Sequence, residues 1–159
     1  QLDRFLMYIK ISQPDAMAEH KILSLVRGEV QNNVAQISEK LSVEDILLAR
    51  KEVLNVHMSD AVEDYLVHLI VATRKPETYD AKLQKLVLYG ASPRATIALD
   101  RASRIHAWLN GKDFVSPEDI QAIVFDVLRH RIILSFEAQA EGVSADDIIA
   151  ALLKVVPLP

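Results

Sequence analysis

Apolar residues recur at helical spacing over much of the chain. Residues 60–73 and the segment that begins at Ser116 both follow i, i+3, i+4, i+7, i+8, the spacing of a helix that buries one face. Their stripes are Val62, Tyr65, Leu66, Leu69 and Ile70, and Ile120, Ile123, Val124, Val127 and Leu128. Residues 92–110 and 144–156 carry two more, namely Ala95, Ala98, Ala102, Ile105 and Leu109, and Ile148, Ile149, Leu152, Leu153, Val155 and Val156. The pattern predicts a bundle of four or five helices.

Short polar motifs mark the starts of these helices. A Ser or Asp followed three residues later by Asp or Glu resembles a capping box, in which two side chains accept hydrogen bonds from unpaired backbone N–H groups. The pairs in this chain are Ser42 with Asp45, Asp60 with Glu63, Ser116 with Asp119, and Ser144 with Asp147. We therefore expect helices to begin at each pair.

The first residues follow a different pattern. Residues 5–12 alternate, with Phe5, Met7, Ile9 and Ile11 on one face, and are the one segment that reads clearly as a strand. A lone strand needs a sheet to join. Because the chain begins at Gln1 with an element already under way, we expect a fragment of a longer protein.

The remaining segments complete a mostly α fold, a short strand–helix piece followed by the bundle. A helix is predicted from residue 14 to about residue 27, closed by Gly28. Residues 28–41 are weakly patterned and predict a loop with a short strand or turn. Residues 75–78 predict a loop, and residues 80–89 fit either a short helix or a strand.

Composition and charge exclude several classes of protein. Half of the 159 residues are apolar, which suffices for a core without disulfides or metal. The net charge of −4 disfavours a protein that coats nucleic acid, and the absence of cysteine excludes a disulfide framework and a thiol nucleophile. No apolar run approaches the ~18 residues that span a bilayer, and no signal peptide is present. We expect no nucleic acid partner and no membrane span.

Motifs for metal and nucleotide binding are missing. No two of the five histidines are three or four residues apart, so no metal site is predicted. The sequence has no phosphate-binding P-loop. Ile123-Val124-Phe125-Asp126 resembles a strand that ends in a magnesium-binding carboxylate, but it falls inside a predicted helix. We expect this chain alone neither to bind ATP tightly nor to hydrolyse it.

Ser92-Pro93-Arg94 is the strongest candidate for chemistry. Serine caps a helix and proline fits its first turn, so Arg94 adds a guanidinium where the helix dipole is already positive. Such a helix start suits an anion, most simply a phosphate. The alternative is a well-capped surface helix with a solvated arginine.

Several motifs in order resemble the C-terminal part of a MoxR-type AAA+ ATPase. The resemblance runs through nearly the whole chain and is weakest around residues 28–41. Its motifs lie at residues 1–6, 73–74, 90–95, 110–120 and 127–132.

The resemblance implies an organisation and a function. Residues 1–40 would be the end of an α/β ATPase core and a linker, and residues 41–159 a helical lid. The parent protein would bind ATP and Mg²⁺, form a hexamer in the cytoplasm, and act as a chaperone on client complexes with partners that carry a von Willebrand factor A domain. Client and pathway stay open.

The resemblance also assigns roles to residues. Arg4 matches an arginine finger that reaches the neighbouring subunit's nucleotide, and Arg94 matches the sensor-2 arginine. Ser92, Pro93 and Arg94 would contact the nucleotide. Without the resemblance, Arg4 is an ordinary charge at a strand edge.

Other polar residues have structural interpretations. Arg101 and Arg104 share a face with Arg94 and are expected to form salt bridges at a subunit interface or to stay solvated. The cluster Arg129-His130-Arg131 is expected to cap the C-terminus of a helix, with a role at an interface as the alternative. Trp108 is expected to be partly buried and to pack against the core.

Two other functions remain open at this point. One is a non-enzymatic helical interaction module, against which the strand at residues 5–12 argues. The other is a helical DNA-binding domain, which the acidic balance disfavours.

Overall fold

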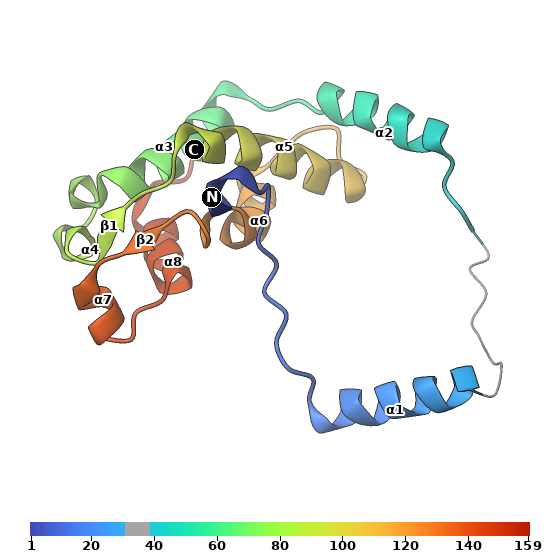
Figure 1. Cartoon of the computed structure of the whole chain (residues 1–159). Helices are drawn as coiled ribbons and strands as arrows, with labels where there is room; N and C mark the ends of the chain where they lie inside the picture. The colour runs from blue at the N-terminus through green and yellow to red at the C-terminus, as the bar shows by residue number, and fades with distance from the viewer. Residues whose placement is uncertain (31–38) are drawn as a thin grey trace. The chain divides into compact units, whose positions relative to one another are not determined.

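Helices dominate the computed structural model, which describes residues 1–30 and 39–159 (Figure 1). Along the chain the elements are η1 (Leu2–Arg4), α1 (Ala16–Val30), α2 (Val43–Asn55), α3 (Asp60–Arg74), η2 (Pro76–Thr78), α4 (Ala81–Gln84), β1 (Val87–Tyr89), α5 (Pro93–Leu109), α6 (Pro117–Leu128), β2 (Ile133–Leu134), α7 (Phe136–Ala140) and α8 (Ala145–Val155). The predicted mostly α fold is confirmed.

The chain divides into two units. Residues 1–9 and 49–159 form one, and residues 10–48 form the other, which contains α1 and the start of α2. The helix α1 buries none of its side chains. The larger unit holds the core and all of the candidate site.

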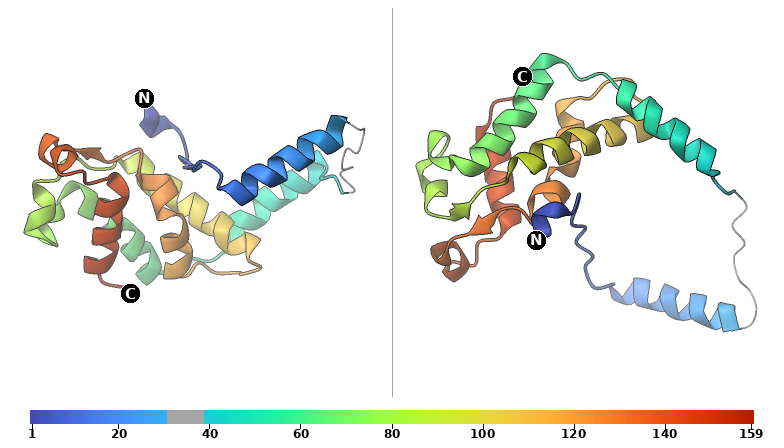
Figure 2. Two further views of the ribbon diagram at one scale, coloured as in Figure 1. Left: turned by 90° about the horizontal axis from the view of Figure 1, so that it is seen from below. Right: turned by 45° about the horizontal axis from the view of Figure 1, so that its top comes forward.

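The core of the larger unit lies between α3, α5, α6 and α8, and Figure 2 shows these helices from two further sides. Both strongest apolar stripes, on α3 and α6, are buried as predicted. The largest fully buried side chains are those of Leu66, Leu69, Ile70, Leu99, Ile120, Leu128, Ile148, Ile149 and Leu152.

The stripe predicted on α5 is only half right. Ala95, Ala98 and Ala102 are buried, but Ile105 and Leu109 are 39% and 70% exposed. The predicted positions advance by 3.5 residues per turn on average. Besides Ala98 and Ala102, the buried face contains a row of residues four apart, at 95, 99, 103 and 107, the i, i+4 ridge that helix packing commonly uses. On α8, Val155 is likewise 37% exposed.

The helix starts agree with the polar motifs in three of four cases. Reciprocal capping bonds join Ser42 to Asp45, Ser116 to Asp119 and Ser144 to Asp147. In α3 the cap is Ser59, whose hydroxyl accepts from the Val62 N–H at 3.4 Å, so the prediction of Asp60 was off by one residue.

The predicted strand at residues 5–12 is absent, because that segment has no strand beside it. The strands that the structure describes, β1 and β2, pair with each other in antiparallel fashion. The Tyr8 N–H instead donates to the Asp126 carbonyl at 2.8 Å. An alternating apolar pattern without a neighbouring edge gives an extended segment and no sheet.

Three further segments can be compared with the elements that the sequence predicts. Helix α1 continues through Gly28 to Val30, so this glycine does not close it. Residues 80–89 contain both of the alternatives, α4 and then β1, and residues 76–78 form a 3₁₀ turn where a loop was predicted. The loop expected at residues 28–41 falls partly on residues 31–38, which lie outside the described residues.

Candidate functional site

The start of α5 is fixed against the end of α3. The Ala91 N–H donates to Thr73 Oγ1 at 2.9 Å, and Arg74 Nε donates to the Ala91 carbonyl at 2.6 Å. A Cβ atom on Gly90 would lie 2.2 Å from the Thr73 carbonyl oxygen, so only glycine allows this approach. These contacts hold Ser92, the N-cap of α5, in place.

Two backbone donors in the first turn of this helix, the N–H groups of Arg94 and Ala95, are already used. Ser92 Oγ accepts from the Arg94 N–H at 3.2 Å, and the Ala95 N–H donates to the Ser92 carbonyl at 2.9 Å. Pro93 has no N–H to offer. The group at this helix start that remains able to bind an anion is therefore the Arg94 guanidinium, whose side chain is 66% exposed.

A carboxylate from the N-terminal turn, that of Asp3, lies at the same place. Ser92 Oγ donates to Asp3 Oδ2 at 2.8 Å, and Arg94 Nη1 lies 3.4 Å from the same oxygen. Arg131 Nε lies 3.3 Å from the other oxygen, Oδ1. Partial burial opposes ionisation of Asp3, but the hydrogen bonds from Ser92 and Arg94 and the charges of Arg131 and Arg94 outweigh it. The pKa of Asp3 is lowered as a result.

Of the two predicted catalytic arginines, Arg94 contacts Asp3 and Arg4 follows Asp3 in the sequence. Arg4 follows Asp3 in η1, is exposed, and makes no ion pair with the residues that the structure describes. Arg94 contacts Asp3 directly. Both side chains are thus accessible from solvent. Their catalytic roles, and direct nucleotide contacts of Ser92 and Pro93, stay predictions.

The basic cluster Arg129-His130-Arg131 does more than cap α6. Arg131 Nη1 donates to the Val127 carbonyl at 3.2 Å, as a cap does. Its Nη2 donates to the Phe5 carbonyl at 2.6 Å, and His130 Nε2 donates to the same oxygen at 3.2 Å. The cluster therefore holds the N-terminal segment against the end of α6. Sequence spacing carries no signal for contacts between residues more than 120 positions apart.

Arg129 and Arg104 both form ion pairs inside the chain. Arg129 pairs with Asp126 and, at 3.0 Å, with Asp146. Arg104 Nε lies 2.9 Å from Asp100, and its Nη1 donates to the Val56 carbonyl. The expectation of a subunit salt bridge or a solvated side chain is therefore wrong for Arg104. The part of the chain that the structure describes offers Arg101 no ion-pair partner.

The turn between α5 and α6 is built around one buried carboxylate, Asp119. Its oxygens accept from the N–H and hydroxyl of Ser116 at 2.9 and 2.8 Å and from Lys112 Nζ at 2.9 and 3.0 Å, while His106 Nδ1 lies 3.0 Å away. The side chain is 1% exposed. Burial acts to raise the pKa of Asp119, but these hydrogen bonds outweigh it and lower the pKa to about 2. The motif at residues 110–120 thus stabilises the turn between α5 and α6.

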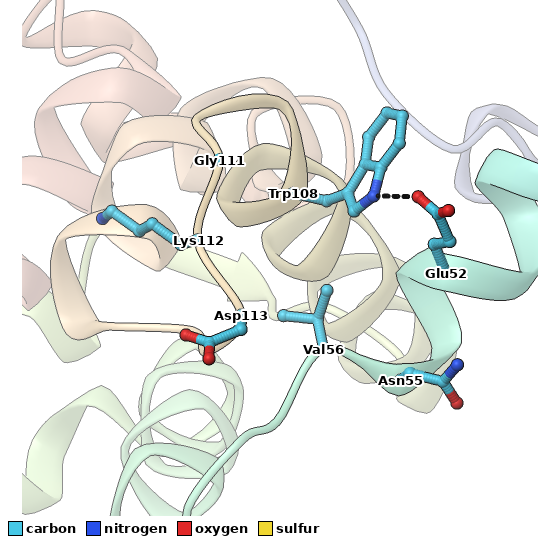
Figure 3. Close-up of a pocket in the computed structure, with 7 residues that line it drawn as sticks. All are labelled: Glu52, Asn55, Val56, Trp108, Gly111, Lys112 and Asp113. Carbon is cyan, nitrogen blue, oxygen red and sulfur yellow. Dashed lines mark hydrogen bonds between the residues drawn. The ribbon is translucent and has the colours of Figure 1, made fainter.

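Figure 3 shows a hollow on the larger unit, and Arg94 is not among the residues that line it. Its volume is about 310 Å³, and Trp108 Nε1 donates to Glu52 Oε2 at 3.0 Å on its wall. Trp108 is 14 residues from Arg94 on the same helix, roughly 21 Å at 1.5 Å per residue. Trp108 also packs against the core, as predicted. The lining residues are Glu52, Asn55, Val56, Trp108, Gly111, Lys112 and Asp113.

Metal ligands and membrane-spanning helices are both missing from the described residues. No three acidic, histidine or cysteine side chains among them lie together as metal ligands would. None of the helices described is both long and apolar enough to cross a membrane.

Known proteins resemble this chain over nearly its whole length. Residues 81–152 match the AAA lid domain. The chain is 36% identical to the chaperone MoxR1 of Mycobacterium tuberculosis over all of its length and 41% of that protein. It is 33% identical to the protein MoxR of Methylorubrum extorquens, over 99% of the chain and 49% of the relative.

A solved structure agrees with these matches. The crystal structure of a candidate ATPase from Cytophaga hutchinsonii superposes with a TM-score of 0.92 at 38% identity, over 99% of this chain and 48% of the other. The chain thus spans about half the length of the relatives that it matches.

Proposed function

This chain is a C-terminal region of the MoxR family of AAA+ proteins, with the AAA lid domain at residues 81–152, and we propose that it senses nucleotide in a longer ATPase. In that protein the lid couples ATP binding and hydrolysis to chaperone-like remodelling or maturation of client complexes. The relative named chaperone MoxR1 supports this proposal. The ATP-binding core and the site for Mg²⁺ lie in a part of the protein outside this chain.

We propose that Arg94 contacts the terminal phosphate of the nucleotide. Its guanidinium presents several N–H donors in one plane, which suits the oxygens of a phosphoryl group. The N-terminus of α5 adds positive potential at the same point. The guanidinium acts without the backbone N–H groups of Arg94 and Ala95, which the Ser92 cap and the first turn already use.

Arg4 is proposed to act toward a neighbouring subunit. It is exposed on the turn that also carries Asp3, so its side chain is free to approach a second chain. An arginine that stabilises charge on a transferring phosphoryl group accelerates hydrolysis by about 10³-fold or more. The assembly that this role requires is a closed ring, which we propose is a hexamer in the cytoplasm. Proteins with a von Willebrand factor A domain are the proposed partners.

The observation that carries the proposal is the placement of Arg94. It lies in the first turn of a 17-residue helix in an AAA lid domain, 66% exposed, with its helix start fixed to α3. Had the guanidinium been buried in the bundle, it could not contact a nucleotide held by another domain.

The test is the substitution Arg94→Ala in the full-length ATPase. Because the donor acts on charge in the transition state, we expect kcat with saturating Mg-ATP to fall about 10²-fold, while thermal unfolding of the 159-residue chain is unchanged. The matched control is Arg101→Ala, an exposed arginine on the same helix, which should leave kcat within about twofold. Unchanged turnover in Arg94→Ala would remove Arg94 from the proposed role.

A further inference from the structure

One carboxylate, that of Asp3, contacts three side chains that are far from it in the sequence. Its Oδ1 faces Arg131, and its Oδ2 receives the Ser92 hydroxyl at 2.8 Å and faces Arg94 at 3.4 Å. The contacts with Ser92 and Arg94 link it to the start of α5, and the contact with Arg131 links it to the end of α6. Asp3 therefore joins the helix start that carries Arg94 to the turn that carries Arg4.

Arg131 holds Asp3 from the protein interior. Its side chain is 2% exposed, and Asp3 is the carboxylate that pairs with it among residues 1–30 and 39–159. Its Nη groups donate to the carbonyl oxygens of Val127, Phe5 and Asp3 itself. A buried guanidinium is costly without a counter-charge, so Asp3 is strongly confined to this place.

Arg94 is held more loosely than Arg131. Its single contact with Asp3, 3.4 Å long, uses one of five N–H groups, and two thirds of the side chain stays exposed. A long arginine side chain on a surface otherwise samples many rotamers and loses conformational entropy when it is ordered. The contact with Asp3 narrows that freedom and leaves the remaining donors for an anion.

We propose that Asp3 is a positioning residue that orients Arg94 toward the phosphoryl oxygens. Because Arg4 follows it directly, the same carboxylate fixes the turn from which Arg4 projects. The inference rests on the proposed function, since it assigns Asp3 a role through Arg94. It differs from a purely structural role in that the effect of Asp3 on turnover requires Arg94.

The test is a double-mutant cycle in the full-length ATPase, with Mg-ATP as substrate. We expect Asp3→Asn to lower kcat about tenfold, since misplacing a catalytic group by 1 Å costs up to ~10²-fold. In the Arg94→Ala background the same change should lower kcat by less than about twofold, because the residue that Asp3 positions is gone. Asp3→Glu, which keeps the charge, should recover part of the loss.

A second variant keeps the test valid if Asp3→Asn does not fold. Asp3→Asn with Arg131→Met removes the buried charge and its partner together, so that no unpaired charge is left buried. It still deprives Arg94 of its carboxylate, so the same tenfold loss is expected. The matched control is Asp100→Asn, which breaks the other aspartate–arginine pair on α5 and should leave kcat unchanged.

The outcomes separate the two proposals. If Arg94→Ala leaves kcat unchanged, the proposed function fails. If Arg94→Ala lowers kcat but Asp3→Asn does not, or lowers it equally with and without Arg94, the positioning role of Asp3 is overturned and the proposed function stands.

Discussion

Asp119 and Asp3 show two uses of a carboxylate in this chain. Asp119 is 1% exposed, and its partners come from α5, the following turn and the first turn of α6. Asp3 is 30% exposed, and its partners include an arginine that faces solvent. The first arrangement stabilises the fold, and the second leaves a charged group available to a ligand.

Asp119 should make the stability of the larger unit depend on pH in the acidic range. Its pKa is about 2 in the folded chain and about 3.9 when unfolded. The ionised form thus contributes about 2 to 3 kcal/mol to the free energy of unfolding. Because the folded pKa is the lower one, this contribution is complete above about pH 4 and is lost as the pH falls toward 2.

The measurement is urea unfolding of the 159-residue chain, followed by fluorescence of Trp108, its one tryptophan. Asp119→Asn should lower the free energy of unfolding by about 2 kcal/mol at pH 7 and flatten its decline below pH 4. The control Asp64→Asn changes an exposed carboxylate on α3. Equal pH profiles for wild type and Asp119→Asn would contradict the assignment.

At the scale of elements, the contact between α3 and the start of α5 depends on the absence of a side chain at residue 90. An alanine Cβ there would meet backbone atoms of Thr73 and Arg74 at 2.2 to 2.6 Å. Backbone cannot rotate away as a side chain does, so the two segments must separate. The hydrogen bond from the Ala91 N–H to Thr73 would then lengthen or break.

Gly90→Ala should therefore destabilise the chain by about 3 kcal/mol, the upper range for overpacking. Gly142→Ala is the matched control, because Gly142 has φ of +73° and a methyl group added there would meet no atom within 4 Å. At residue 142 the cost is the backbone conformation alone, about 1 kcal/mol. Thermal unfolding of both variants checks the difference, and equal losses would show that the close approach at residue 90 is unimportant.

The elements that sequence predicts well are those that depend on neighbours a few residues away. The capping pairs at Ser42, Ser116 and Ser144 and the stripes of α3 and α6 are such cases, since both follow helical geometry. The strand at residues 5–12 failed because a strand depends on another strand, which spacing along the chain cannot supply. The two-residue strand β2 is too short to show alternation.

The residues of the candidate site also fall into those that local sequence predicts and those that it does not. Ser92, Pro93 and Arg94 were recognisable from the cap motif and the resemblance, because they are consecutive. Asp3 and Arg131 were not, since they meet across 128 positions, and neither residue type at its position suggests the other. The contacts that fix the site are thus the part that the three-dimensional structure adds.

At the scale of the whole molecule, the two candidate arginines belong to one unit. Residues 1–9 pack with residues 49–159, so Arg4 and Arg94 are carried by the same body. The division of the sequence into residues 1–40 and 41–159 stays a prediction. A lid that moves with the nucleotide state would move both arginines together for as long as the contacts of Asp3 and Phe5 with Arg131 persist.

The groups that this unit offers to a ligand predict how the 159-residue chain binds nucleotide by itself. Its candidate site offers a guanidinium, and the backbone N–H groups beside it are already paired. The sequence has no P-loop to hold the α- and β-phosphates. One exposed arginine contact contributes little against bulk water, because screened surface charges attract by only about 1 kcal/mol or less.

Isothermal titration of the 159-residue chain with Mg-ATP should therefore show no binding in the micromolar range. The full-length protein, for which we propose ATPase activity, is titrated under the same conditions as the control and should bind. Micromolar affinity in the shorter chain would mean that the lid holds nucleotide on its own. In that case the shared role of core and lid, on which the assignment of Arg94 as a sensor depends, would have to be replaced.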